Sequence, residues 1–324
     1  MVMSQKNEEN MDFLNKNGYG ISINGNDERD TQLDHPEDNE WNIPHEMRDD
    51  NSNGDDTTQN TKQNYTSDPN SITVTISDKQ TPIVILYGPP ACGKTMTLVR
   101  LARFLKDQGY QIIPDNNFRE SEDPKYHQLC KDFDNIIASN EAASSTDRIS
   151  FMLVKVLKDG HPICQILEAP GEHYYKPGEK DKDYPPYIYR IINQNNRKVW
   201  AIIIEPDWKN EVDKRGYVDN VKYLKQKVGH RNNGFVFVYN KIDKSQAWRI
   251  SDAIKEVSDQ FTGIFVPFKN QNPITKLWRS YLCDFVTFQT GNYSQAMDGT
   301  LTYTPSNDQF PQRLWNSILK QLRG

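Results

Sequence analysis

The chain has 324 residues, of which 26% are charged, and 39 basic against 44 acidic side chains give a formal net charge of −5. Its longest apolar runs, such as Ile83–Tyr87 and Val199–Ile204, are far shorter than the ~20 residues that span a bilayer, and the first ten residues carry no apolar signal region. The four cysteines form no CxxC pair, which argues against a disulfide framework or a zinc site and favours a cytoplasmic location.

The first 70 residues differ from the rest in composition. They hold 13 Asn, 16 acidic and only 5 basic residues, a net charge of −11, which leaves a net charge of +6 for residues 71–324. Such a segment cannot bury enough apolar surface to offset the entropy of ordering. We therefore expect a disordered acidic leader over residues 1–70, followed by one domain over residues 71–324.

The first elements of the body are strands and a helix. Alternation over Ile72–Ile76 predicts an edge strand, and the continuous apolar run Pro82–Tyr87 predicts a strand buried on both faces of a parallel sheet. A Gly/Pro-rich turn and an amphipathic helix follow. Residues 149–157 and 162–167 read as two strands, and Asp159-Gly160 between them is a hairpin turn signal.

The second half of the body alternates strands with helices. Residues 199–204, 234–239 and 284–288 are apolar strand candidates, and amphipathic patterns predict helices over 217–228, 247–261 and 314–322. This alternation predicts a three-layer α/β/α fold with a mainly parallel sheet and one antiparallel hairpin strand.

A phosphate-binding loop follows the Pro82–Tyr87 strand. Residues 88–95 read GPPACGKT and match GxxxxGK[ST] in full, between a predicted strand and a predicted helix. In such a loop the backbone N–H groups surround phosphate, the lysine reaches the β/γ-phosphates and the last hydroxyl ligates Mg²⁺. The expected phosphate-binding residues are therefore Gly88, Pro89, Pro90, Ala91, Cys92, Gly93, Lys94, Thr95 and Met96, with Thr95 as a metal ligand.

A candidate base-recognition motif follows the 234–239 strand. Asn240-Lys241-Ile242-Asp243 resembles the NKxD motif of Ras-like GTPases. An Asp carboxylate at Asp243 suits guanine, because it accepts hydrogen bonds from the base N1–H and N2–H₂, a donor pair that adenine lacks. The phosphate loop by itself also resembles the loops of AAA+ ATPases.

Two further segments carry the resemblance. Glu168-Ala-Pro-Gly171 resembles the DxPG segment of the same GTPases, in which the glycine amide contacts the γ-phosphate and the aspartate, here Glu168, holds Mg²⁺ through water. Thr146 lies 22 residues before Glu168, about where that family places the threonine that closes over Mg²⁺ and the γ-phosphate, and it has Ser144 and Ser145 beside it.

The resemblance extends over residues 80–322 and is to the Ras-like, translation-factor-related (TRAFAC) class of P-loop GTPases. The chain departs from that family in a long insertion at about residues 108–145, which contains a strand-like Tyr110–Ile113 and an amphipathic Tyr126–Ala138. Thr290-Gly291, after the last predicted strand, is the candidate loop that touches the base through backbone amides, although Gly263–Phe268 competes as the last strand.

The family resemblance implies a protein that binds GTP or GDP with Mg²⁺, hydrolyses GTP slowly and acts as a nucleotide-dependent switch. The candidate catalytic residues are Lys94, Thr146, Glu172 and His173; small GTPases have Gln, and translation factors His, where this chain has Glu172. Arg119 and Arg148 lie in no recognisable arginine-finger pattern, so a protein effector or GTPase-activating partner is expected. Neither nucleic-acid binding nor a lipid anchor is indicated, and the oligomeric state stays open.

Two alternatives remain at this point. The first is a pseudo-GTPase that holds nucleotide as part of an interaction module, which Glu168 and Glu172 favour because both replace the residues of the family. The second is a P-loop ATPase of the AAA+ type or a kinase, although Glu205-Pro206 after the 199–204 strand is not the acidic pair of such ATPases.

Overall fold

The computed structural model describes residues 69–119, 124–138, 151–178, 183–206, 208–229, 232–247, 249–277, 279–295 and 301–323. These residues all belong to one compact unit of the chain. All but the last two residues of the expected leader, and the candidate switch residues Ser144, Ser145 and Thr146, lie outside the described residues.

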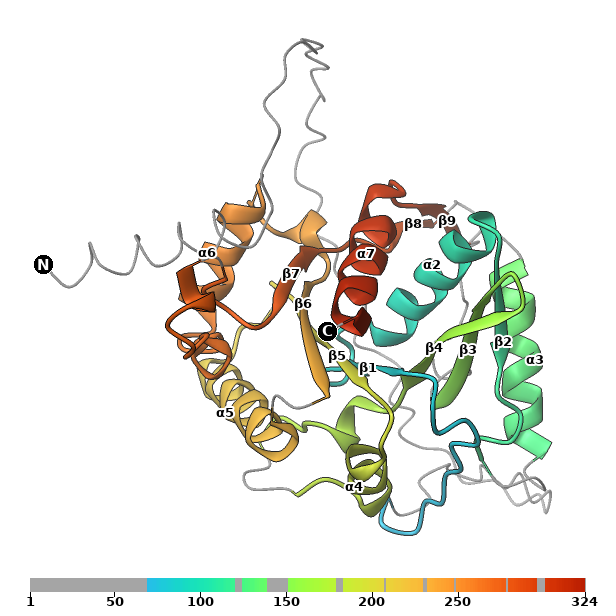
Figure 1. Ribbon diagram of the computed structural model, residues 1–324. Coiled ribbons are helices and arrows are strands. Elements are labelled where there is room, and N and C mark those ends of the chain that lie inside the picture. Colours follow the sequence, from blue (N-terminus) through green and yellow to red (C-terminus); the bar gives the residue numbers. More distant parts are fainter. Residues whose placement is uncertain are drawn as a thin grey trace, which may run out of the picture. The chain divides into compact units, whose positions relative to one another are not determined.

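The described residues form a seven-stranded sheet of order β2-β3-β4-β1-β5-β6-β7 (Figure 1). Neighbouring strands are parallel from β4 through β1, β5 and β6 to β7. The strands are β1 (Ile83–Tyr87), β2 (Tyr110–Pro114), β3 (Met152–Lys158), β4 (His161–Glu168), β5 (Lys198–Ile204), β6 (Asn233–Tyr239) and β7 (Asp284–Thr287). Every residue of β1 and β5 is buried, as expected for central strands covered on both faces.

One strand of this sheet, β3, runs antiparallel to all the others, as expected. The predicted hairpin joins β3 to β4 through Asp159 and Gly160, both with positive φ, as a tight hairpin turn requires. Strand β2, from the insertion, pairs antiparallel with β3 and becomes the edge strand. The expected strand at Ile72–Ile76 is wrong: these residues have no strand pairing, and Thr75 instead donates its N–H to the carbonyl of Phe118.

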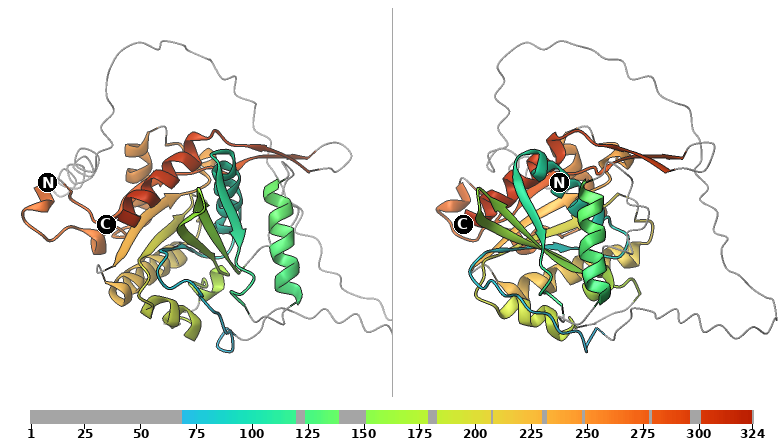
Figure 2. Two further views of the ribbon diagram at one scale, coloured as in Figure 1. Left: turned by 45° about the vertical axis from the view of Figure 1, so that its right-hand side comes forward. Right: turned by 90° about the vertical axis from the view of Figure 1, so that its right-hand side faces the viewer.

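Helices cover both faces of the sheet, so the expected three-layer α/β/α fold is confirmed. Helices α2 and α7 lie on one face and α4 and α5 on the other, while α3 packs outside β2 and α2, and α6 packs beside β7 (Figures 1 and 2). The helices are α2 (Lys94–Asp107), α3 (Pro124–Ala138), α4 (Pro186–Asn193), α5 (Glu211–Val228), α6 (Ile250–Gln260) and α7 (Gln309–Arg323). In the described part of the chain, no helix has the length and hydrophobicity needed to cross a membrane.

The last strand of the sheet is β7, so the competing strand at Gly263–Phe268 is wrong. That segment forms turns and a short 3₁₀ helix, Val266–Phe268. After β7 the chain forms a separate two-stranded hairpin of β8 (Gly291–Gln295) and β9 (Leu301–Pro305), which the sequence did not predict and which extends away from the sheet (Figure 2).

The strand order indicates which end of the sheet is expected to bind a ligand. The neighbours of β1 are β4 and β5, so the connections on its two sides run in opposite directions across the sheet. In open α/β sheets ligands bind outside the carboxyl ends of the strands at this switch point. The phosphate loop, Glu168 and Asn240 lie at the carboxyl ends of β1, β4 and β6.

Candidate nucleotide-binding site

The phosphate loop runs from Gly88 to Thr95 and turns through two residues in left-handed conformation. Ala91 has φ 60° and Gly93 has φ 87°, and helix α2 begins at Lys94. Within the described residues, no acceptor is found for the backbone N–H groups of Thr95 and Met96, among the first donors of the helix. Orphaned N–H groups at a helix N-terminus, together with the positive end of the helix dipole, form an anion-binding site.

Buried side chains fix the shape of the loop. The Lys94 ammonium group donates to the Pro89 carbonyl at 3.0 Å across the loop. The Cys92 thiol is fully buried under the loop, and burial raises its pKa to about 11. A Cβ on Gly88 would lie 2.7 Å from the Cys92 sulfur, so the first glycine of the motif is required by this packing.

Glu168 and Thr95 meet at the candidate metal position. The Thr95 hydroxyl donates to Glu168 Oε1 at 3.1 Å, and the Phe151 N–H donates to Oε2 at 2.7 Å. Burial raises the pKa of the Glu168 carboxyl, while Lys94 and these hydrogen bonds lower it. A hydroxyl and a carboxylate are hard oxygen ligands of the kind that Mg²⁺ prefers, so the donor set fits Mg²⁺ held jointly with phosphate oxygens. No group of three or more His, Cys, Asp or Glu side chains suited to a metal is found among the described residues.

The segment after β4 packs directly on the phosphate loop. A Cβ on Gly171 would lie 2.2 Å from the Pro90 nitrogen and 2.6 Å from the Pro89 oxygen, so only glycine fits there. Glu172 is exposed. The His173 ring lies edge-on to Phe151, and its Nδ1 forms a 2.6 Å hydrogen bond with the Tyr187 hydroxyl of α4.

The Asn240–Asp243 segment packs against the phosphate loop through two side-chain hydrogen bonds. Asn240 is buried, and its Nδ2 donates to the Cys92 carbonyl at 2.9 Å. Its Oδ1 is also buried, and no partner for it is found among the described residues. Lys241, with φ 54°, donates to the Ala91 carbonyl at 3.3 Å and forms an ion pair with Glu205 at the end of β5. The exposed Asp243 carboxylate has no hydrogen-bond or ion-pair partner within the described part of the chain.

The segment after β7 lies beside this motif. Phe288 donates its N–H to the Tyr239 carbonyl at 2.8 Å and accepts from the Ile242 N–H at 3.2 Å. The residues that follow, Gln289 and Thr290, are therefore next to the Asn240–Asp243 segment in space. Gly291 begins β8, and a Cβ there would lie 2.4 Å from the Thr304 oxygen. Of the expected pair, Gly291 is therefore packed inside the β8–β9 hairpin, whereas Thr290 lies in the loop before it. Gln289 belongs to the same loop as Thr290.

The structure brings together most of the predicted site residues, from four separate stretches of the described chain: 88–96, 168–173, 240–243 and 290–291. Thr146 and Arg148 lie outside the described residues. Sequence reasoning missed Glu205 as the partner of Lys241 and Tyr187 as the partner of His173. Both contacts join residues that are distant in sequence. The one available signal was that Glu205 directly follows an apolar strand, which places it at the end of the sheet where the site lies.

Comparison with known proteins gives distant structural similarities. No protein-family model matches the sequence, and a search of curated proteins finds no significant match. Among solved structures, the chain is similar to nucleolar GTP-binding protein 1 from Plasmodium falciparum, with 14% identity and a TM-score of 0.38 over 76% of this chain and 90% of that chain. It is also similar to the signal recognition particle receptor SRb-GTP/SRX complex from Chaetomium thermophilum, with 11% identity and a TM-score of 0.34 over 65% of this chain and 91% of that chain.

Proposed function

We propose that this protein binds GTP and GDP and acts as a nucleotide-dependent switch with slow GTP hydrolysis. The observation that carries the proposal is the pairing of two loops: Asn240 and Lys241 donate to carbonyls of the phosphate loop, which holds Asp243 at the same end of the sheet. A carboxylate without a protein partner, beside a phosphate-binding loop, suits guanine, because guanine's N1–H and N2–H₂ lie on one edge and can both donate to it. Adenine has no such donor pair, so it would leave the carboxylate without a hydrogen bond.

Mg²⁺ is proposed as the metal of the site, held by Thr95 and Glu168 together with the nucleotide. When bound it would neutralise charge between the β- and γ-phosphates. Glu168 departs from the aspartate of the family, and both of its oxygens already accept hydrogen bonds within the protein. This engagement favours a weaker metal contact, and with it the alternative of a nucleotide-stabilised interaction module. A protein effector or activating partner is part of the switch proposal.

Competition binding tests the proposed function. Fluorescent GDP bound to the purified protein is displaced by unlabelled GDP, ATP or xanthosine diphosphate. GDP is expected to bind at least about 100-fold more tightly than ATP, because adenine leaves the Asp243 carboxylate unpaired where guanine donates to it. Equal displacement by ATP and GDP would contradict guanine recognition and favour the ATPase alternative.

Hydrolysis is expected to be slow, and Glu172→Gln is expected to raise the single-turnover rate by about tenfold. The exposed Glu172 directly follows Gly171, where a carboxylate can orient water but adds negative charge near the γ-phosphate; an amide orients water without the charge. His173 is engaged with Tyr187 instead.

The matched control is Glu211→Gln, which removes the charge of another exposed glutamate and is expected to leave the rate unchanged. Phosphate release after mixing with excess protein measures the rate. A wild-type protein that binds GTP tightly, with no turnover in either variant, would favour the interaction-module alternative instead.

A further inference from the structure

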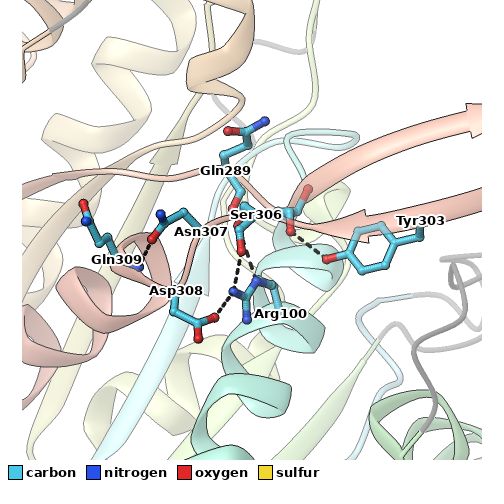
Figure 3. A network of polar contacts seen from close by, with 8 residues as sticks. Arg100, Gln289, Tyr303, Ser306, Asn307, Asp308 and Gln309 are labelled. Carbon is cyan, nitrogen blue, oxygen red and sulfur yellow. Dashed lines mark hydrogen bonds and ion pairs between the residues drawn. The ribbon is translucent and has the colours of Figure 1, made fainter. Parts of the chain in front are cut away.

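The loop between β7 and β8 is held through its carbonyl groups. The Gln289 carbonyl accepts from the Ser306 hydroxyl at 2.6 Å, and the Thr290 carbonyl accepts from the Tyr303 hydroxyl at 2.6 Å and the Ser306 N–H at 3.2 Å (Figure 3). Ser306 therefore holds two successive peptide groups of the loop. Both Tyr303 and Ser306 belong to the return strand of the β8–β9 hairpin or directly follow it.

Fixing the Gln289 carbonyl also fixes an N–H group. A trans peptide is planar, so the N–H of Thr290 points opposite to the carbonyl of Gln289 and away from the Ser306 hydroxyl. Among the described residues, no acceptor is found for the N–H groups of Gln289 and Thr290. Within the described chain, the Thr290 N–H is thus a free donor on the side that Ser306 does not occupy, in the loop that follows the contact of Phe288 with Ile242.

Arginines of helix α2 hold the hairpin in turn. The buried Arg100 donates to the Ser306 carbonyl at 2.7 Å and to the Ser306 hydroxyl at 3.3 Å, and it pairs with Asp308 (Figure 3). One turn further along the same helix, the Arg103 guanidinium lies 5.3 Å from the centre of the Tyr303 ring. Helix α2 begins at Lys94 of the phosphate loop, so one helix joins the phosphate end of the site to the loop after β7.

We propose that Ser306, held by Arg100, is a positioning residue that fixes the Gln289–Thr290 peptide so that the Thr290 N–H donates to O6 of guanine. This inference rests on the proposed function and goes beyond it, because it makes the β8–β9 hairpin part of guanine recognition. Arg100 and Ser306 do not touch the base; they act through the orientation of one peptide group. Loosening the hairpin therefore weakens the contact to O6 while leaving the contacts of Asp243 in place.

The test compares two nucleotides that differ only at position 6. In 6-thio-GDP a sulfur, which is a weaker hydrogen-bond acceptor, replaces O6, while the N1–H and N2–H₂ groups remain. Affinities for GDP and 6-thio-GDP are measured on the full chain for wild type, Ser306→Ala and Arg100→Lys. Wild type is expected to prefer GDP, and Ser306→Ala is expected to reduce that preference by about threefold to tenfold, the effect of one lost neutral hydrogen bond.

Ser258→Ala is the matched control, because Ser258 also donates to a backbone carbonyl, that of Ile254 within α6, outside the loop. It is expected to leave the preference unchanged. If Ser306→Ala leaves the ratio of the GDP and 6-thio-GDP affinities unchanged, whether or not both affinities fall, the inference is overturned while the proposal of guanine binding stands. If Arg100→Lys retains the wild-type ratio, the role of Arg100 is overturned; failure of wild type to bind GDP would overturn the proposed function as well.

Discussion

Replacing Asp243 by Asn is expected to weaken GDP binding by about 100-fold and to make xanthosine diphosphate the preferred ligand. In the proposed site the carboxylate would accept two hydrogen bonds from guanine. An Asn amide would place a donor against one of guanine's donors, at a cost of about 2–3 kcal/mol. Xanthine carries a carbonyl where guanine carries N2–H₂, so the amide donor finds an acceptor there. Asp243 is exposed and has no partner among the described residues, so the fold should tolerate the change.

Displacement of fluorescent GDP or xanthosine diphosphate by each unlabelled nucleotide gives the preference of the variant. Asp259→Asn is the control, since it removes the same charge from an exposed position on α6. It should leave both affinities unchanged. A variant that loses affinity for both nucleotides to the same extent would show that Asp243 does not read the base.

Gly93→Ala is expected to lower the free energy of unfolding by about 2–4 kcal/mol and to weaken GDP binding at least about 100-fold. Gly93 has φ 87°, and a Cβ there would lie 2.4 Å from Asn240 Nδ2. The methyl group therefore adds backbone strain and displaces the amide that donates to Cys92. This single change disturbs the phosphate loop and the base-recognition loop together.

The control for this substitution is Gly263→Ala. Gly263 also has φ 87°, but no atom outside its immediate neighbours would lie within 4 Å of a Cβ added there, so the variant shows the cost of backbone strain alone. Urea denaturation and nucleotide titration of both variants separate the two effects. Equal destabilisation, with equal GDP affinity, would mean that the contact with Asn240 contributes nothing.

Most of the fold was predictable because its signals are local. Buried strands such as β1 and β6 are continuous apolar runs, and the phosphate loop needs glycines at fixed spacing, so each can be read from a short window. The alternation at Ile72–Ile76 misled because alternation indicates a half-buried extended segment and does not specify a pairing partner. The segment is held by the contact of Thr75 with Phe118 instead.

The unpredicted features depend on contacts distant in sequence. Strands β8 and β9 are rich in polar residues and lack an apolar pattern, and the anchor of their hairpin, Arg100, lies about 200 residues earlier in the chain. The same holds for His173, which would position water only if the turn shifted by one residue from Glu172; its contact with Tyr187 on α4 appears only in the folded chain. The roles of His173 and Thr146 in hydrolysis stay predictions.

The two prolines of the phosphate loop have a thermodynamic consequence. Pro89 and Pro90 have fixed φ angles, and the close approach of Gly171 restrains the same two residues from outside. A segment restrained in this way loses its conformational freedom when the protein folds, so little remains to be lost when a ligand arrives. Calorimetry of phosphate binding is therefore expected to show a smaller unfavourable entropy than a glycine-rich loop of the same length would give.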